Sequence, residues 1–198
     1  SVQRIPAVIW FCDLRGFSSV ASRVPQEELV EILDAYLEAM ARPVLDHRGQ
    51  ILKFLGDGFL ATFDLAQRRR ESVCVDALAA ASQLLEYFPR FNAERRAAGK
   101  KTLEFGVALH LGEVLYGNIG ASERLDFTVV GSAVNEASRI EGMCRPLQRK
   151  VLLRCPEHGS MFDVTTGQCV LPSDDGWTGT LHTYTTRVVD DVVQVSLA

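Results

Sequence analysis

The chain has 198 residues, enough for one domain with its own core, and its 47% hydrophobic and 23% charged content is ordinary for a globular protein. Its net charge of −4 argues against a broad nucleic-acid-binding surface, so any bound phosphate is expected to belong to a small ligand. No apolar run approaches the roughly 20 residues that cross a bilayer. The five cysteines form no CxxC pair, so we expect reduced thiols and a cytoplasmic domain.

The first predicted element is a strand that ends in a carboxylate. Val8–Cys12 is apolar, and Asp13 follows it, before a turn that contains Gly16, Phe17 and two serines. A carboxylate at a strand end can hold a hard cation, and the amides of such a turn can point at anionic oxygens. Asp13 is therefore a candidate metal ligand, and Gly16 and Phe17 are candidates for binding the substrate. Taken alone, Asp13 could equally do no more than end the strand.

Two long helices are predicted in the first half of the chain. The first opens at Pro25, where proline is tolerated, and stops at Gly49. Its apolar residues recur at three and four positions: Leu29, Leu33, Tyr36, Leu37 and Met40. The second helix spans Val73–Phe88 and is ended or bent by Pro89. The polar residues Asn92–Lys101 are predicted to form a linker loop.

A hairpin is predicted between these helices. Two apolar segments, Ile51–Leu55 and Phe59–Phe63, flank a Gly-Asp-Gly break with Asp57 at the turn. Lys53 lies in the first segment, where it is expensive to bury without a partner. An exposed Lys and a turn-forming Asp are enough to explain this stretch alone. If the two strands concerned are neighbours, Asp57 and Asp13 make a two-metal carboxylate pair, a condition that the sequence leaves open.

The second half continues the alternation of strands and helices. Leu103–Leu111 and Val114–Ile119 are predicted to pair about Gly112 and Glu113, and Phe127–Val130 is a short strand. A third helix is predicted over Ala133–Cys144, followed by strands at Val151–Arg154, near Gln168–Leu171 and at Thr180–Val189. The order strand, helix, hairpin, helix, hairpin, helix predicts an α+β fold with helices packed against a mostly antiparallel sheet.

Four stretches together resemble the catalytic domain of class III nucleotidyl cyclases, the adenylyl and guanylyl cyclases. They read FCDLRGFS, KFLGDGF, LHLGEVLYGNIG and FTVVGSAVNEASRI, and they occur in the family's order. The resemblance is strongest over residues 8–145, while residues 150–198 match poorly. We expect one catalytic domain over residues 1–198, with 150–198 as its atypical C-terminal part.

The resemblance implies a ferredoxin-like palm that is active as a head-to-tail homodimer, with active sites at the subunit interface. It also implies two divalent metal ions, Mg²⁺ or Mn²⁺, held by Asp13, Asp57 and the backbone carbonyl of Leu14. Asn135 matches the residue that orients the ribose, and Arg139 matches the arginine that stabilises charge on the α-phosphate. These two residues are four apart and therefore lie on one face of the predicted helix.

The resemblance also indicates, at two further positions, which purine base of the nucleotide is bound. Lys53 and Thr128 fall where this family reads the purine, and a Lys donor with a Thr hydroxyl suits the N1 and N6 of adenine. Guanylyl cyclases typically carry Glu and Cys at these positions. The Lys–Thr pair is similar to a bacterial subgroup of adenylyl cyclases, some of which respond to bicarbonate. Arg124 is a candidate triphosphate contact, or a solvated loop arginine.

The implied activity is conversion of ATP to 3′,5′-cyclic AMP and pyrophosphate. In the shared sites, one subunit gives the two aspartates and its partner gives the other four residues: Lys53, Thr128, Asn135 and Arg139. Guanylyl cyclase activity and an inactive nucleotide-binding signalling module remain as alternatives, whereas a diguanylate cyclase would need a run of paired glycines with adjacent acids. Because the chain begins Ser1-Val-Gln-Arg, we expect a regulatory or membrane domain elsewhere in a longer protein.

Overall fold

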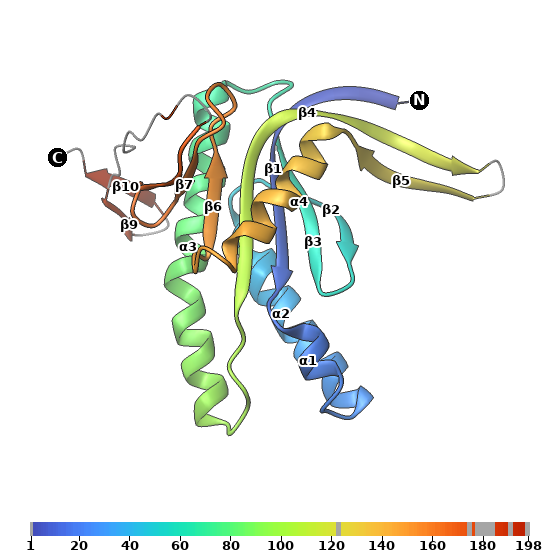
Figure 1. The fold of residues 1–198 in the computed structure, drawn as a ribbon, viewed down its shortest axis with the longest axis vertical. Coiled ribbons are helices and arrows are strands. Elements are labelled where there is room, and N and C mark those ends of the chain that lie inside the picture. The colour runs from blue at the N-terminus through green and yellow to red at the C-terminus, as the bar shows by residue number, and fades with distance from the viewer. Residues whose placement is uncertain (1, 122–123, 174–175, 177–184, 190–191, 197–198) are drawn as a thin grey trace.

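Strands and helices alternate along the chain in the computed structural model (Figure 1), which describes residues 2–121, 124–173, 176, 185–189 and 192–196. The first half contains β1 (Val2–Leu14), α1 (Phe17–Ala21), α2 (Gln26–Asp46), β2 (Gln50–Leu55), β3 (Gly58–Asp64) and α3 (Arg70–Ala97). The second half contains β4 (Phe105–Ala121), β5 (Arg124–Val130), α4 (Ser132–Cys144), β6 (Val151–Arg154), β7 (Met161–Asp163), β8 (Cys169–Leu171), β9 (Thr185–Val189) and β10 (Val192–Ser196).

One sheet organises the fold, with strand order β2-β3-β1-β4-β6-β7-β8 and β5 paired with β4. β1 is antiparallel to both of its neighbours, β3 and β4, whereas β4 and β6 run parallel. The order β2-β3-β1-β4, with α2 and α3 as the connecting helices, is the ferredoxin-like arrangement that the resemblance implies. The predicted α+β fold class is therefore confirmed. β9 and β10 pair with each other.

Helices cover both faces of the sheet, and α4 crosses the face opposite to α2 and α3 (Figure 1). Alternate residues of β1 separate the two cores. Trp10 and Cys12 pack with residues of α2 and α3, such as Tyr36, whereas Ile9 packs with Ala137 of α4. Because both faces are covered, the strands nearest the centre are buried on both sides. The end of β1 is thereby held in a fixed position, and Asp13 lies at that end.

The second long helix is longer than predicted. α3 passes through Pro89 and ends at Ala97, so the linker loop predicted after it is wrong. Proline removes one backbone hydrogen bond of the helix, but contacts made by residues on both sides of Pro89 compensate for this loss. Phe88 lies 4.6 Å from Phe105 between ring centroids, and the Asn92 amide bonds both the N–H and the carbonyl of Leu103, at 2.9 and 2.8 Å.

The predicted hairpin about Gly112 and Glu113 is also wrong, because β4 runs straight through both residues. Gly112 pairs with Ala7 of β1, and a Cβ placed there would lie 2.5 Å from the Cβ of Ala133. The glycine therefore allows α4 to approach the sheet closely, and it is not part of a turn. β4 instead forms its hairpin with β5, which begins at Arg124.

Other predicted elements are confirmed within a few residues, namely α2, the β2–β3 hairpin, α4, β6 and β8. Of the strand predicted at Thr180–Val189, β9 begins at Thr185, and residues 180–184 lie outside the described residues. β7 and β10 were not predicted; β7 has only three residues, too few for a periodic signal. Within the described part of the chain, no helix combines the length and apolar character that crossing a membrane requires.

Candidate active site

The two candidate metal-binding aspartates are neighbours in space. Asp13 pairs with Gly58 in the β1–β3 register, and the Leu14 N–H donates to the Asp57 carbonyl at 3.0 Å. A Cβ at Gly58 would lie 2.0 Å from the carbonyl oxygen of Cys12, so only glycine permits the strands to approach here. The neighbourhood that the sequence left open is thus present in the structure, and backbone contacts hold it.

The environment of this pair is suited to a divalent cation. Burial raises the pKa of Asp13 to about 6, assisted by the charge and hydrogen bonding of Asp57, while the Leu14 N–H, 3.1 Å from Asp13 Oδ1, acts in the opposite direction. Because the charge of Asp57 opposes the ionisation of Asp13, a cation bound between them would stabilise the ionised form of Asp13. In the described residues, no group of three or more Asp, Glu, His or Cys side chains forms a metal cage. Mg²⁺ commonly binds through one or two carboxylates together with substrate phosphates, so the donor set fits.

Glu141 is a third acidic side chain near the pair, and the sequence reasoning missed it. Burial, together with the charges of Asp13 and Asp57, raises its pKa to about 7, against the opposing charge of Arg15. A signal was available, because Glu141 follows the buried Ala137 by four residues and therefore continues the sheet-facing stripe of α4. A carboxylate on an apolar stripe indicates a specific environment.

Gly16 and Phe17 form the turn that leads out of β1. Gly16 has φ +74°, and its carbonyl accepts the N–H groups of Ser19 and Val20 at 3.0 and 3.2 Å. Phe17 is half-buried and packs against the larger core. Glycine permits the left-handed conformation and the aromatic ring anchors the start of α1, so this turn has a fixed position directly beyond Asp13.

The candidate base-reading residues are described to different extents. Lys53 is half-buried in β2 at a register irregularity, where it pairs with Leu60 while Ile51 pairs with Ala61. The backbones of Arg124 and Thr128 lie in β5, opposite residues of β4, and their side chains lie outside what the structure describes. The structure therefore positions Lys53 on the strand before the Asp57 turn.

Asn135 and Arg139 share the exposed face of α4, while the opposite stripe, Ala133, Ala137, Ile140 and Cys144, is buried. The Arg139 side chain is 79% exposed, and its nearest ionic contact is Glu136 at 3.8 Å. Among the described residues, no hydrogen bond or ion pair joins either side chain to Asp13 or Asp57. One chain thus presents two separate polar groups of residues, one at the end of β1 and one on the outer face of α4.

Comparison with known sequences shows the family of the chain. The family described as "Adenylate and Guanylate cyclase catalytic domain" matches residues 2–159. An adenylate cyclase of Anabaena cylindrica is 34% identical over 165 residues, covering 77% of this chain and 32% of the relative. Adenylate cyclase 1 of Rhizobium meliloti is 33% identical over 145 residues, covering 72% of this chain and 21% of the relative. The chain thus spans about a third or less of these relatives.

Solved structures resemble the fold closely. The adenylyl cyclase CyaB from P. aeruginosa superposes with a TM-score of 0.68 at 28% identity, covering 78% of this chain and 79% of that structure. The guanylyl cyclase Cya2 superposes with a TM-score of 0.68 at 25% identity, covering 98% and 89%. With most of its length matched by the family and its ferredoxin-like sheet shared with these enzymes, the chain belongs to the adenylate and guanylate cyclase catalytic domain family.

Proposed function

We propose that this domain is an adenylyl cyclase that converts ATP to 3′,5′-cyclic AMP and pyrophosphate. The observation that carries the proposal is the adjacency of Asp13 and Asp57, held by the Leu14–Asp57 backbone bond. Two curated relatives above 30% identity are named adenylate cyclases, which supports the choice of reaction. Lys53 and Thr128 support the choice of base.

The residues divide the chemical work among them. Asp13, Asp57 and the Leu14 carbonyl would hold two Mg²⁺ or Mn²⁺ ions, whose chemistry is to lower the pKa of the ribose 3′-hydroxyl and to neutralise the triphosphate. Asn135 orients the ribose so that the hydroxyl attacks the α-phosphorus in line with the leaving pyrophosphate. Arg139 stabilises the charge that develops on the α-phosphate, a task suited to the guanidinium fork.

The remaining candidates bind the nucleotide. Gly16 and Phe17 lie in the turn beside Asp13 and are assigned to the phosphates, with Arg124 as a further triphosphate contact. Lys53 donates to the adenine N1, and the Thr128 hydroxyl accepts from the N6 amino group. Guanine presents the opposite donor and acceptor pattern, so this pair selects against GTP.

The separation of the two groups of residues supports a site shared between two copies. Asn135 and Arg139 are exposed on α4, away from any described bond to the aspartates. A head-to-tail homodimer lets the α4 face of one copy meet the β1 end of the other, which gives two complete sites. Because the curated relatives are much longer, we propose that a regulatory part of the protein lies elsewhere in the full chain.

Product analysis tests the proposal. The domain is incubated with ATP or GTP and with Mg²⁺ or Mn²⁺, at several protein concentrations. We expect cyclic AMP from ATP, with specific activity that rises as the chain dimerises. Cyclic GMP as the main product would instead favour the alternative that the likeness to a guanylyl cyclase raises. No cyclic product at any concentration would contradict the enzyme and favour a nucleotide-binding signalling module.

A base-exchange variant tests the assigned specificity separately. Replacing Lys53 by Glu and Thr128 by Cys gives the pattern typical of guanylyl cyclases. We expect the ratio of ATP to GTP turnover to fall by about tenfold or more, the range that one or two hydrogen bonds to a base control. Unchanged selectivity in a folded, active variant would show that these positions do not read the purine.

A further inference from the structure

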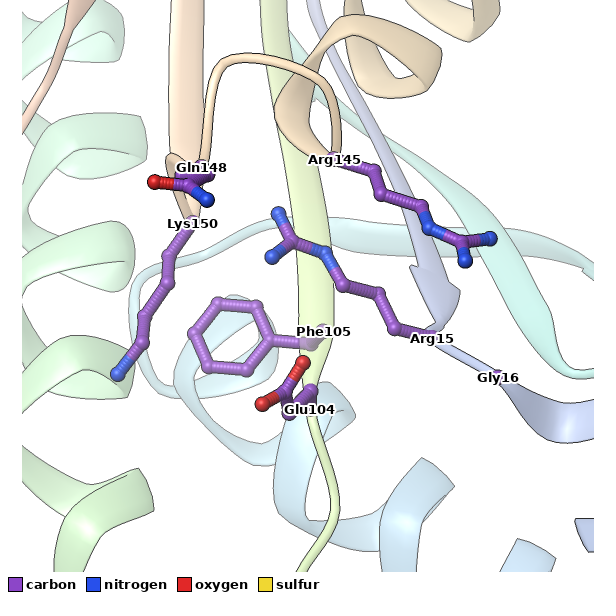
Figure 2. A pocket seen from close by; sticks show the side chains of 7 residues that line it. All are labelled: Arg15, Gly16, Glu104, Phe105, Arg145, Gln148 and Lys150. Carbon is purple, nitrogen blue, oxygen red and sulfur yellow. The ribbon is translucent and has the colours of Figure 1, made fainter.

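A basic pocket lies beside the candidate metal site, on the other side of β1 from Asp57. Its volume is about 460 Å³. Figure 2 shows the residues that line it: Arg15, Gly16, Glu104, Phe105, Arg145, Gln148 and Lys150. Arg15 follows the end of β1, Phe105 begins β4 and Lys150 precedes β6, so three adjacent strand ends form the floor. The pocket is therefore built from the β4–β6 side of the sheet, whereas the Asp57 turn lies on the β3 side.

The lining carries three cations and one anion. Arg145 and Lys150 are exposed, and neither makes an ion pair with a described residue. They lie at opposite edges of the pocket, and their side chains point in different directions (Figure 2). Their neighbour Arg149 differs, because its Nε lies 3.2 Å from Asp163. Arg145 and Lys150 are thus available to a ligand, whereas the neighbouring Arg149 is already paired with Asp163.

Arg15 is the deepest of the three cations, and it is held in place. Its Nη2 donates to the Arg149 carbonyl, which ties the end of β1 to the loop before β6. Its side chain also forms a hydrogen bond with Cys144 and lies within range of the charge of Glu141. Arg15 is therefore a fixed positive charge in the floor of the pocket, and Arg145 and Lys150 are the cations left for a ligand.

Shape and chemistry narrow the ligand to a phosphate-bearing anion. Guanidinium and ammonium groups together bind phosphate oxygens through charge-assisted hydrogen bonds. The Phe105 ring, with Lys150 Nζ 6.0 Å from its centroid, gives one wall that excludes water. The volume lies within the range of small-molecule sites and exceeds what one phosphate needs, so a diphosphate fits.

We propose that this pocket binds a small phosphate-bearing anion, either pyrophosphate or free phosphate. Pyrophosphate is the first candidate on the basis of the proposed function, because the reaction would release it beside Asp13, two residues before Arg15. Gly16 lines the pocket and also belongs to the turn that we assign to the substrate phosphates, so the pocket and the proposed active site are adjacent. The pocket then holds the anion after it leaves the reacting centre.

Titration calorimetry in EDTA tests the pocket directly, since chelation removes the divalent ions that the aspartates would use. The probes are inorganic pyrophosphate and inorganic phosphate, added to the whole domain at low salt. We expect R145Q and K150Q each to raise the dissociation constant for pyrophosphate by about tenfold, the effect of one lost charge-assisted hydrogen bond. R90Q, which removes an exposed arginine from α3, is the matched control and should change it by less than about twofold.

The outcomes separate this site from the cyclase proposal. D57N should lose cyclase activity and keep pyrophosphate binding, because the carboxylate lies on the other side of β1. Tighter pyrophosphate than phosphate identifies a diphosphate site, and equal affinities identify a single-phosphate site. No binding of either probe, or binding that R145Q and K150Q leave unchanged, overturns the pocket even if the domain makes cyclic AMP. Binding that depends on both residues in a chain without cyclase activity upholds the pocket and rejects only the enzyme.

Discussion

At the scale of single residues, the charge of Asp57 opposes the ionisation of Asp13, whose carboxyl group is half-buried. The folded-state pKa of Asp13, about 6, lies above its ordinary value of 3.8, first because of burial and then because of the Asp57 charge. A raised carboxyl pKa means that the folded protein binds a proton more tightly than the unfolded chain does. Stability in the absence of metal therefore falls as pH rises from about 4 through about 6.

Asp57→Asn should remove the repulsion and stabilise the metal-free domain. We expect a gain of about 0.5–1 kcal/mol at pH 7.5, reduced by solvent screening of a half-exposed pair, and little gain at pH 5, where Asp13 is mostly protonated. Urea unfolding in EDTA at both pH values measures this. Adding Mn²⁺ should stabilise the natural chain but not the variant. A gain of equal size at both pH values would contradict charge repulsion as the cause.

Gly106 and Glu141 form a second coupled pair. A Cβ at Gly106, opposite Asp13 in β4, would lie 2.0 Å from the Glu141 Oε1. Gly106→Ala should therefore cost about 1–3 kcal/mol of the free energy of unfolding, as overpacking does. In a Glu141→Ala background the same change should cost less than about 1 kcal/mol, because the clashing atom is gone. Additive costs in the double-mutant cycle would show that the glycine is needed for another reason.

Gly58→Ala is the contrasting control at the same site. Its added Cβ would meet the backbone carbonyl of Cys12 at 2.0 Å, and truncating a side chain does not relieve a contact with the main chain. The variant should be more damaging than Gly106→Ala in any background. Denaturant unfolding of the two single variants compares them.

The sequence indicated Asp13 and Asp57 because each follows an apolar strand and each matches a metal-binding aspartate of the family that the chain resembles. Their adjacency was not predictable from local pattern, since β1 and β3 are separated by α1, α2 and β2 before they pair. Glu141 was missed because the motif ending at Ile140 drew attention to the exposed face of α4. Its position on the buried stripe was nevertheless readable from the helical spacing.

At the scale of elements, the helix that continues through proline is the largest departure from expectation. Pro89 is exposed in α3, so its ring contributes a backbone penalty and little packing. Pro89→Ala should stabilise the domain by about 1–2 kcal/mol, less than the full helix-interior cost because the native helix has adapted. Pro43→Ala in α2 is the matched control, and it should gain less because Pro43 is buried. An unchanged or lower unfolding free energy for Pro89→Ala would contradict this.

Local signals located most elements but not their ends. The period of α2 and the Gly-Asp-Gly break gave correct elements, because their pattern is strong and local. α3 and β4 extend beyond their predicted ends because tertiary contacts override local breakers. The Asn92 side chain forms hydrogen bonds with the backbone of Leu103 near the end of α3. In β4, Gly112 allows Ala133 of α4 to pack closely against the strand. Local pattern predicts that an element ends at a proline or a glycine, whereas here Pro89 and Gly112 each lie inside an element.

At the scale of the whole molecule, a single chain separates the residues that the proposed reaction needs together. The β1 end carries the acidic pair, and the outer face of α4 carries Asn135 and Arg139, 79% exposed in the case of Arg139. Exposure of functional polar groups on two different surfaces is expected when a second copy completes each site. The sequence predicted this division only through the family resemblance, since no pattern within one chain specifies an interface.

Mixing two inactive variants tests the shared site. In a dimer of Asp57→Ala with Arg139→Ala, one site carries both defects and the other carries none. Random exchange makes half of the dimers mixed, so about a quarter of the natural activity should return. The matched control mixes Asn135→Ala with Arg139→Ala, which lie on the same face of α4 and leave a defect in every site. Cyclic AMP production by the unfractionated exchange mixture is the measurement. Recovery in the first mixture but not in the second requires residues from two chains at each site, whereas recovery in neither would place the complete site within one chain.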